Sequence, residues 1–379
     1  MVQNAANSCS AKHLNSYVGK PTMKYVNLGS SGLRVSALCL GTWHLPTLTE
    51  LDEYGVRKVD EELFLRIAKK AYDLGINFYD TSNRYHGGMA PVDLNHVGNA
   101  EKILGKFLAM VERESVVLAT KVRGMMAAWQ NGEGLSRKHI RWQVKQSLMR
   151  LGTSHIDLYQ LHWPDPSTPK LETLRTLNYL IEDGTVDYVG MSNYPASEMV
   201  EFMEIARKNL LEGFITAQDL YNVIDRDLER EKSWILQKNG ISVLAYSPLA
   251  QGVLSGKYVD FASGKWKVPQ GTRAETFQSV RRYFTDKNLN IMKELREIAV
   301  SKGVTMTQVS LAWLMSSYER LGFITVPIVG VTSLEQLEEN VASILVNLSS
   351  DDLKRIDEVS HHSRRLSDLE RAECHGDPF

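Results

Sequence analysis

The sequence predicts a (β/α)8 barrel, an α/β fold in which eight parallel strands close into a cylinder inside a ring of helices. Three apolar segments end on the ionisable residues Asp80, Lys121 and His162, at equal intervals (121 − 80 = 41 and 162 − 121 = 41). Amphipathic stretches, around 100–108 and 140–151, separate these segments. Strand and helix alternating at one period indicate a parallel sheet or a closed barrel, in which all strands end at the rim that carries the chemistry.

Eight apolar segments are predicted as the barrel strands. They are 37–40, 77–80, 116–121, 156–162, 186–190, 214–218, 242–246 and 323–327. Ahead of them, residues 24–27 and 34–36 predict a small hairpin that plugs the bottom of the barrel. Behind them, residues 350–361 predict an extra helix that packs on the outside.

The segments between the strands show helical periodicity or loop composition. Residues 61–74 place apolar side chains on one face, and Ser136 is the predicted N-cap of a helix that ends near Leu151. Further helices are predicted over 171–181, 288–302, 307–318 and 333–340. Long loops are predicted over 46–59 and 86–99, and 250–282 is the least regular part of the chain.

The composition is that of an ordinary globular protein. The 379 residues are 43% hydrophobic and 23% charged, and 44 basic against 45 acidic residues leave a net charge of −1. This balance gives no reason to expect a nucleic-acid or membrane partner, and the three separated cysteines suggest no disulfide framework. We expect a disordered tail over 1–22, one barrel domain over 23–362, a polar tail over 363–379, and a cytoplasmic location.

The ionisable side chains at the strand ends, together with Tyr85 in the loop after Asp80, are a set of groups that could protonate a carbonyl oxygen. A phenol with its ordinary pKa of about 10 transfers protons poorly near neutral pH. We expect a buried Lys121 to lower the pKa of Tyr85, and Asp80 to keep that lysine charged and in place. With His162 as a hydrogen-bonding orienter, the group could protonate a carbonyl, whereas the hydride must come from a nicotinamide.

The motifs along the chain, in their order, resemble those of the aldo-keto reductases from about residue 24 to residue 340. The likeness is carried by Gly-Thr-Trp at 41–43, Asn-Phe-Tyr-Asp-Thr at 77–81, Leu-Ala-Thr-Lys at 118–121, Asp-Leu-Tyr-Gln-Leu-His at 157–162, Gly-Met-Ser-Asn at 190–193 and the stretch 246–258. It implies a small-molecule aldehyde or ketone reduced to an alcohol, or the reverse, with Tyr85 as general acid. The layout is closest to the branch with potassium-channel β subunits and bacterial general-stress-type reductases.

The resemblance also implies a cofactor site and a substrate site. The implied cofactor contacts are Thr42, Trp43, Asp80, Ser192, Asn193, Gln218, Tyr246, Ser247, Leu249, Gln251, Lys257, Arg273, Gly330, Thr332, Ser333, Gln336, Glu339 and Asn340. NADP(H) is favoured, and NAD(H) stays open because Gly330-Val331 stands where many members carry Lys or Arg. The implied substrate contacts are Trp43, Tyr85, His162 and Trp163, of which the two tryptophans are either rim packing or an apolar wall for the substrate.

Two other classes of enzyme fit the sequence less well. A metal-dependent barrel hydrolase would recruit histidines such as His44, His86 and His96, but it needs closely spaced His pairs, and the chain has no His-x-His motif. No metal is therefore predicted. A dinucleotide-binding dehydrogenase would need a Gly-x-Gly-x-x-Gly motif after the first strand, which Gly29-Ser-Ser-Gly32 does not supply.

A regulatory subunit that binds NADPH as a redox sensor, like the channel β subunits, also stays open. The layout of residues 246–258 fits that branch. His162 argues against it, because the channel β subunits carry Asn there, and members that reduce carbon–carbon double bonds carry Glu.

Overall fold

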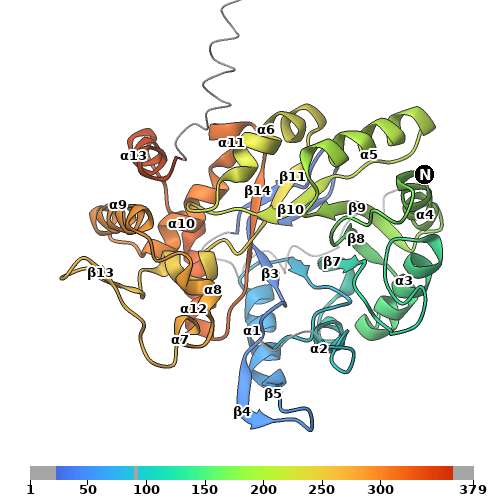
Figure 1. Ribbon diagram of the computed structural model, residues 1–379, viewed down its shortest axis with the longest axis horizontal. Helices are drawn as coiled ribbons and strands as arrows, with labels where there is room; N and C mark the ends of the chain where they lie inside the picture. The colour runs from blue at the N-terminus through green and yellow to red at the C-terminus, as the bar shows by residue number, and fades with distance from the viewer. Residues whose placement is uncertain (1–22, 89–92, 362–379) are drawn as a thin grey trace, which may run out of the picture.

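The computed structural model describes residues 23–88 and 93–361, so the predicted tails at 1–22 and 363–379 lie outside the described residues. The barrel strands are β3 (Cys39–Gly41), β6 (Phe78–Asp80), β7 (Val117–Val122), β8 (Ile156–Leu161), β9 (Val186–Ser192), β10 (Thr216–Leu220), β11 (Ser242–Tyr246) and β14 (Thr325–Val329). They pair in parallel around a closed barrel in the order β10-β11-β14-β3-β6-β7-β8-β9, with helices outside (Figure 1). The predicted (β/α)8 barrel is confirmed, although β10 and β14 each begin and end two residues later than expected.

Most of the surrounding helices fall on segments with predicted helical periodicity, whereas the helices at Ala196–Asn209 and Asp227–Asn239 were not predicted. They are α1 (Glu61–Asp73), α2 (Asn99–Leu108), α3 (Arg137–Leu151), α4 (Lys170–Glu182), α5 (Ala196–Asn209), α6 (Asp227–Asn239), α9 (Asp286–Lys302), α10 (Met306–Met315), α11 (Ser317–Leu321), α12 (Leu334–Ala342) and α13 (Ser350–Ser360). The Ser136 side chain accepts the backbone N–H of His139 at 3.3 Å, so it is the N-cap of α3 as predicted. The outer helix α13 is tied to α9 by ion pairs from Arg355 to Glu294 and from Lys302 to Asp352.

The predicted hairpin, β1 (Tyr25–Asn27) with β2 (Arg34–Ser36), closes the amino-terminal end of the barrel. Leu28 and Val35 are buried in one cluster with interior side chains of the barrel strands, such as Phe78 and Leu158. The turn approaches the barrel so closely at Gly29 that an added Cβ would lie 2.3 Å from the carbonyl oxygen of Ile215. Only glycine fits this contact, and the φ of Gly29, 60°, is also one that glycine adopts readily.

The prediction of a loop over 46–59 is wrong, because this segment forms the antiparallel hairpin β4 (Thr47–Leu51) and β5 (Arg57–Val59). A side-chain turn explains it: Asp52 Oδ1 accepts the backbone N–H groups of Tyr54 and Val56, both at 2.9 Å. Gly55 provides the positive φ, 74°, that the turn requires. Figure 1 shows the hairpin projecting from the barrel at the lower edge of the view.

The irregular segment after β11 contains short elements only. They are η2 (Ala250–Ser255), β12 (Val259–Asp260), β13 (Lys265–Trp266), α7 (Arg273–Thr276) and α8 (Gln278–Arg281); the remaining short helices are η1 (Arg113–Ser115) and η3 (Ser343–Leu345). Within 247–252, the residues Ser247, Ala250, Gln251 and Gly252 all have positive φ angles. Such turns direct successive backbone N–H groups to one side, which favours anions.

His96 links the β4–β5 hairpin to the loop that precedes α2. Its Nε2 lies 2.7 Å from Asp52 Oδ2 and its Nδ1 lies 2.8 Å from Asp93 Oδ1. Burial would lower the pKa of His96, but its hydrogen bonds to Asp52 and Asp93 outweigh burial and raise the pKa above the ordinary value. The imidazolium is therefore the form that holds the hairpin.

Deprotonating His96 is expected to loosen the hairpin. Because the pKa is raised on folding, the stabilisation is complete at a pH below the unfolded value of about 6.5, and it is lost as the pH rises through the folded value. Amide exchange protection over residues 47–59, corrected for intrinsic rates, should fall across that range in the native protein. In His96→Gln, protection should be lower and should no longer depend on pH over this range. A pH dependence of protection equal to that of the native protein would contradict the role assigned to His96.

Candidate active site

The carboxyl ends of β6 and β7 bring Asp80 and Lys121 together in the barrel interior. Asp80 is 2% exposed and Lys121 is 0% exposed. Lys121 Nζ donates to Asp80 Oδ1 at 2.6 Å, to the Thr81 carbonyl oxygen at 2.9 Å and to the Tyr85 hydroxyl oxygen at 3.1 Å. The lysine thus joins the carboxylate to the phenol, as the sequence predicted.

Two glutamine side chains hold the other oxygen of the carboxylate. Gln160 Nε2 and Gln218 Nε2 donate to Asp80 Oδ2 at 3.1 Å and 2.9 Å. Gln160 was missed from the sequence, although its position offers a signal: it pairs in register with Lys121 across β7 and β8 and faces the same interior. A buried carboxylate with this many donors is held in one position.

His162 follows β8 and lies beside Tyr85, with the ring centroids 5.5 Å apart and the rings nearly perpendicular. Its Nδ1 lies 3.1 Å from Ser82 Oγ. That hydroxyl oxygen already accepts the backbone N–H of Arg84 at 3.2 Å, so its own proton is available for Nδ1. This arrangement favours the tautomer with the proton on Nε2. Ser82 was also missed, and its place between Asp80 and Tyr85 is the only sequence signal.

The charges at the site differ from expectation in one respect. Burial raises the pKa of Tyr85, and Lys121 opposes this without reversing it, so the expected net lowering is wrong. Burial would lower the pKa of Lys121, but Asp80 and Tyr85 raise it. Burial, with the charges of Lys121 and Arg84, holds the pKa of His162 well below its usual range. At neutral pH the site therefore holds a phenol, an ammonium and a neutral imidazole.

The predicted nicotinamide contacts at the ends of β9, β10 and β11 form one hydrogen-bonded group. Asn193, which has a φ of 62°, donates from Nδ2 to Ser192 Oγ at 2.9 Å and to the His162 carbonyl oxygen at 3.1 Å. Tyr246 donates its hydroxyl to Asn193 Oδ1 at 2.8 Å. Asn193 and Tyr246 also border a hollow of about 360 Å³, but its other lining residues include Asp219 and Lys232, which pair on the side of the barrel that faces α6.

Two further predicted contacts, Lys257 and Arg273, form a basic group with His44, which was considered only as a possible metal ligand. Lys257 is exposed, and the other two are half-buried. Burial and the charge of Arg273 lower the pKa of His44, to about 3, and the pKa of Lys257. Burial also lowers the pKa of Arg273. His44 Nδ1 is buried and has no hydrogen-bond partner among the described residues. Basic groups placed so close together fit a bound polyanion such as a pyrophosphate.

The remaining predicted cofactor residues lie at two places. Thr42 is buried and donates to the Asp80 carbonyl oxygen at 3.2 Å, whereas Trp43 is 52% exposed. Ser333 is the N-cap of α12 and accepts the Gln336 N–H, and the Gln336 side chain accepts the Thr332 N–H at 2.9 Å. The other members have these burial classes: Asn340 is buried, Leu249, Gln251 and Glu339 are half-buried, and Gly330 is exposed.

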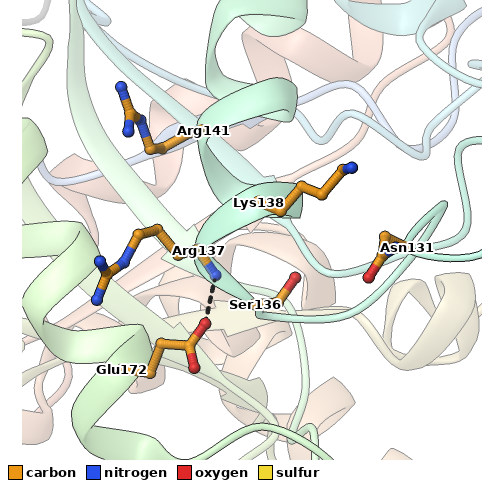
Figure 2. Close-up of a pocket in the computed structure, with 6 residues that line it drawn as sticks. All are labelled: Asn131, Ser136, Arg137, Lys138, Arg141 and Glu172. Carbon is orange, nitrogen blue, oxygen red and sulfur yellow. Dashed lines mark hydrogen bonds between the residues drawn. The ribbon is translucent and has the colours of Figure 1, made fainter.

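A larger hollow, of about 550 Å³, lies elsewhere. Figure 2 shows its lining at the start of α3: Asn131, Ser136, Arg137, Lys138, Arg141 and Glu172. None of these residues was predicted to be functional, and Glu172 Oε1 already accepts the backbone N–H of Arg137 at 3.0 Å. Volume therefore does not identify the active site; the buried charges at the barrel mouth do.

The histidines considered for a metal do not gather around one point. His86 and His96 lie with ring centroids 5.5 Å apart, and both ring nitrogens of His96 contact carboxylates. In the part of the chain that the structure describes, His155, Asp157 and Asp187 form the one group with metal-ligand spacing. Asp157 is already paired with Arg113 at 2.6 Å. Within the same described residues, no helix is both long and apolar enough to cross a membrane.

A closed barrel whose rim joins a phenol, an ammonium and a carboxylate defines an oxidoreductase of the aldo-keto reductase class. Residues 37–361 match the model of the aldo/keto reductase family, and the chain belongs to this family. The predicted family and enzyme class are thereby confirmed.

Several relatives match almost their whole length. The uncharacterized oxidoreductase YrpG of Bacillus subtilis is 33% identical over 343 residues, 89% of this chain and 96% of its own. A putative voltage-gated potassium channel subunit beta of Schizosaccharomyces pombe is 34% identical over 343 residues, 88% of this chain and 92% of its own. The L-glyceraldehyde 3-phosphate reductase of Escherichia coli K12 is 32% identical over 347 residues, 89% of this chain and 92% of its own.

Proposed function

We propose that this protein reduces a small-molecule aldehyde or ketone to an alcohol with NADP(H), and that Tyr85 is the general acid. The proposal rests on the position of one nitrogen: Lys121 Nζ lies 2.6 Å from Asp80 Oδ1 and 3.1 Å from the Tyr85 hydroxyl. The raised pKa of Tyr85 keeps the phenol protonated at neutral pH, which is the form that an acid in reduction requires.

The roles of the catalytic residues follow from these contacts. The nicotinamide supplies a hydride to the carbonyl carbon when it is bound. Tyr85 transfers its hydroxyl proton to the carbonyl oxygen, and the adjacent Lys121 ammonium stabilises the phenolate that remains. His162 donates a hydrogen bond from Nε2 to the same oxygen. Asp80 keeps Lys121 charged inside an interior that excludes water.

The cofactor proposal rests on two groups of residues. Ser192, Asn193, Gln218 and Tyr246 would hold the nicotinamide, with Thr42 and Trp43 beside it. The basic group of His44, Lys257 and Arg273, with the positive-φ turn at 247–252, would hold the pyrophosphate. NADP(H) is favoured over NAD(H), although Gly330 offers no charged side chain for the 2′-phosphate. Fluorescence titrations with NADPH and NADH measure this preference.

The direct test is turnover. Purified protein with 4-nitrobenzaldehyde should consume NADPH, as followed by the absorbance of the reduced nicotinamide, and form the alcohol. A second candidate function, a cofactor-binding regulatory subunit, is favoured by relatives named as channel β subunits. Tight NADPH binding without turnover of any aldehyde would support that candidate and refute the enzymatic proposal.

Ser82→Ala is expected to reduce kcat about tenfold while leaving cofactor affinity unchanged, because it removes one hydrogen bond that orients His162. Loss of the Ser82 proton frees the imidazole to adopt the other tautomer. Nitrogen-15 NMR of labelled histidine distinguishes the two tautomers of His162 directly. A native tautomer and native kcat in Ser82→Ala would show that Ser82 only supports the loop.

A further inference from the structure

We propose that the natural substrate carries an anionic group, a carboxylate or a phosphate, and that Arg84 and Arg123 bind it beside the reacting carbonyl. The inference rests on the proposed function, because Tyr85 and His162 set the position of the carbonyl oxygen. The sequence predicted no anion site at this side of the mouth, where Trp163 was left as either rim packing or an apolar wall for the substrate.

Arg84 immediately precedes Tyr85 in the loop after β6. Its Nη1 donates to the Met125 carbonyl oxygen at 2.8 Å. Its stem lies on Gly124, where an added Cβ would come within 2.3 Å of Arg84 Cδ. The side chain is thus held against the loop that follows β7, and in the described part of the chain no carboxylate forms an ion pair with it. Its charge also acts on His162.

Arg123 lies two residues after Lys121, just beyond the end of β7. Its guanidinium lies over the indole of Trp163, 5.2 Å from the ring centroid. Nη1 contacts the exposed Glu133 at 3.3 Å, and the buried Nε has no hydrogen-bond partner among the described residues. The φ of Arg123 is 137°, a conformation that residues with a side chain rarely adopt. Strained backbone and unsatisfied buried donors are both typical of functional positions.

Both arginines lie near His162, which would bind the carbonyl oxygen: the charge of Arg84 contributes to the lowered pKa of His162, and Arg123 covers the neighbouring Trp163. Arg84 is anchored at Met125, two residues beyond Arg123. Trp163, under Arg123, lies 4.5 Å from His162 between ring centroids. The proposed nicotinamide contacts lie at the ends of β9 to β11, so a substrate held between the two groups would extend toward Trp163 and the arginines.

This arrangement suits an oxyanion better than a neutral group. Arginine presents several N–H donors in a plane that matches carboxylate and phosphate oxygens. One carboxylate, Glu133, contacts this pair, and it is half-exposed at the edge. A substrate anion would neutralise the charge of Arg84, and it would be attracted to the mouth from a distance.

Matched substrate pairs test the proposal with the full-length protein and NADPH. The carboxylate pair is 4-carboxybenzaldehyde and its neutral methyl ester, and the phosphate pair is 4-formylphenyl phosphate and 4-methoxybenzaldehyde. We expect kcat/KM for at least one anion to exceed that of its neutral partner by tenfold or more, and the ratio to fall as ionic strength rises. The pair with the larger ratio identifies the anion.

The variants Arg84→Gln and Arg123→Gln are each expected to reduce this ratio severalfold. Arg137→Gln removes the same charge from the exposed start of α3 and should leave both the ratio and the activity unchanged. Equal kcat/KM within both pairs, or a ratio that survives both substitutions, would overturn the anion proposal while aldehyde reduction stands. No turnover of any of the four aldehydes would instead refute the proposed function.

Discussion

Tyr85→Phe is expected to reduce turnover by roughly 10² to 10⁴-fold, the usual contribution of a positioned general acid. The substitution removes the hydroxyl group that would donate the proton to the carbonyl oxygen, whereas the aromatic ring remains and packs against His162. Cofactor should still quench tryptophan fluorescence with native affinity, because the proposed nicotinamide contacts come from other strands.

The control for this variant is Tyr318→Phe, which removes a phenol oxygen from an exposed side chain on α11. It should match the native protein in turnover and in cofactor binding. Native turnover in Tyr85→Phe would show that another group donates the proton, and lost cofactor binding would show that Tyr85 has a structural role instead.

Lys121→Met is expected to lower the free energy of unfolding by about 3–5 kcal/mol and to remove nearly all activity. The variant leaves the Asp80 carboxylate, 2% exposed, without its counter-charge. It also removes the charge that opposes the burial-raised pKa of Tyr85 and that would stabilise the phenolate. Urea denaturation measures the stability, and turnover is measured on protein shown to be folded by circular dichroism.

The double variant Asp80→Asn with Lys121→Met separates the two effects. It removes both charges of the buried pair, so most of the stability should return, whereas turnover should not. A double variant as unstable as Lys121→Met would mean that packing around the lysine, not charge pairing, accounts for the loss. Recovery of turnover would contradict the role of Lys121 beside the phenol.

The three ionisable residues found by their spacing share one property: each lies at the carboxyl end of a barrel strand. Asp80, Lys121 and His162 could be found because their spacing repeats and because a barrel brings strand ends to one rim. The hairpin at 47–59 was missed because its strands are short and exposed, so that little apolar alternation marks them.

Other features depend on contacts that no spacing reveals. Gln160 and Ser82 act through the oxygen of Asp80 and the nitrogen of His162, and the sequence offers only their positions beside known candidates. The net shift of the pKa of Tyr85 depends on how much burial opposes Lys121, and burial is a property of the folded chain. The basic group of His44, Lys257 and Arg273 comes from segments far apart in the sequence.

Hydride transfer from nicotinamide is proposed to be coupled to proton transfer from Tyr85. Isotope transfer tests this coupling: NADPH that carries deuterium at the transferable position of the nicotinamide is mixed with 4-nitrobenzaldehyde and the native protein, and the alcohol is analysed by mass spectrometry. We expect deuterium on the former carbonyl carbon with the native protein and almost no alcohol with Tyr85→Phe. Alcohol without deuterium, or equal amounts of labelled alcohol from both proteins, would contradict this coupling.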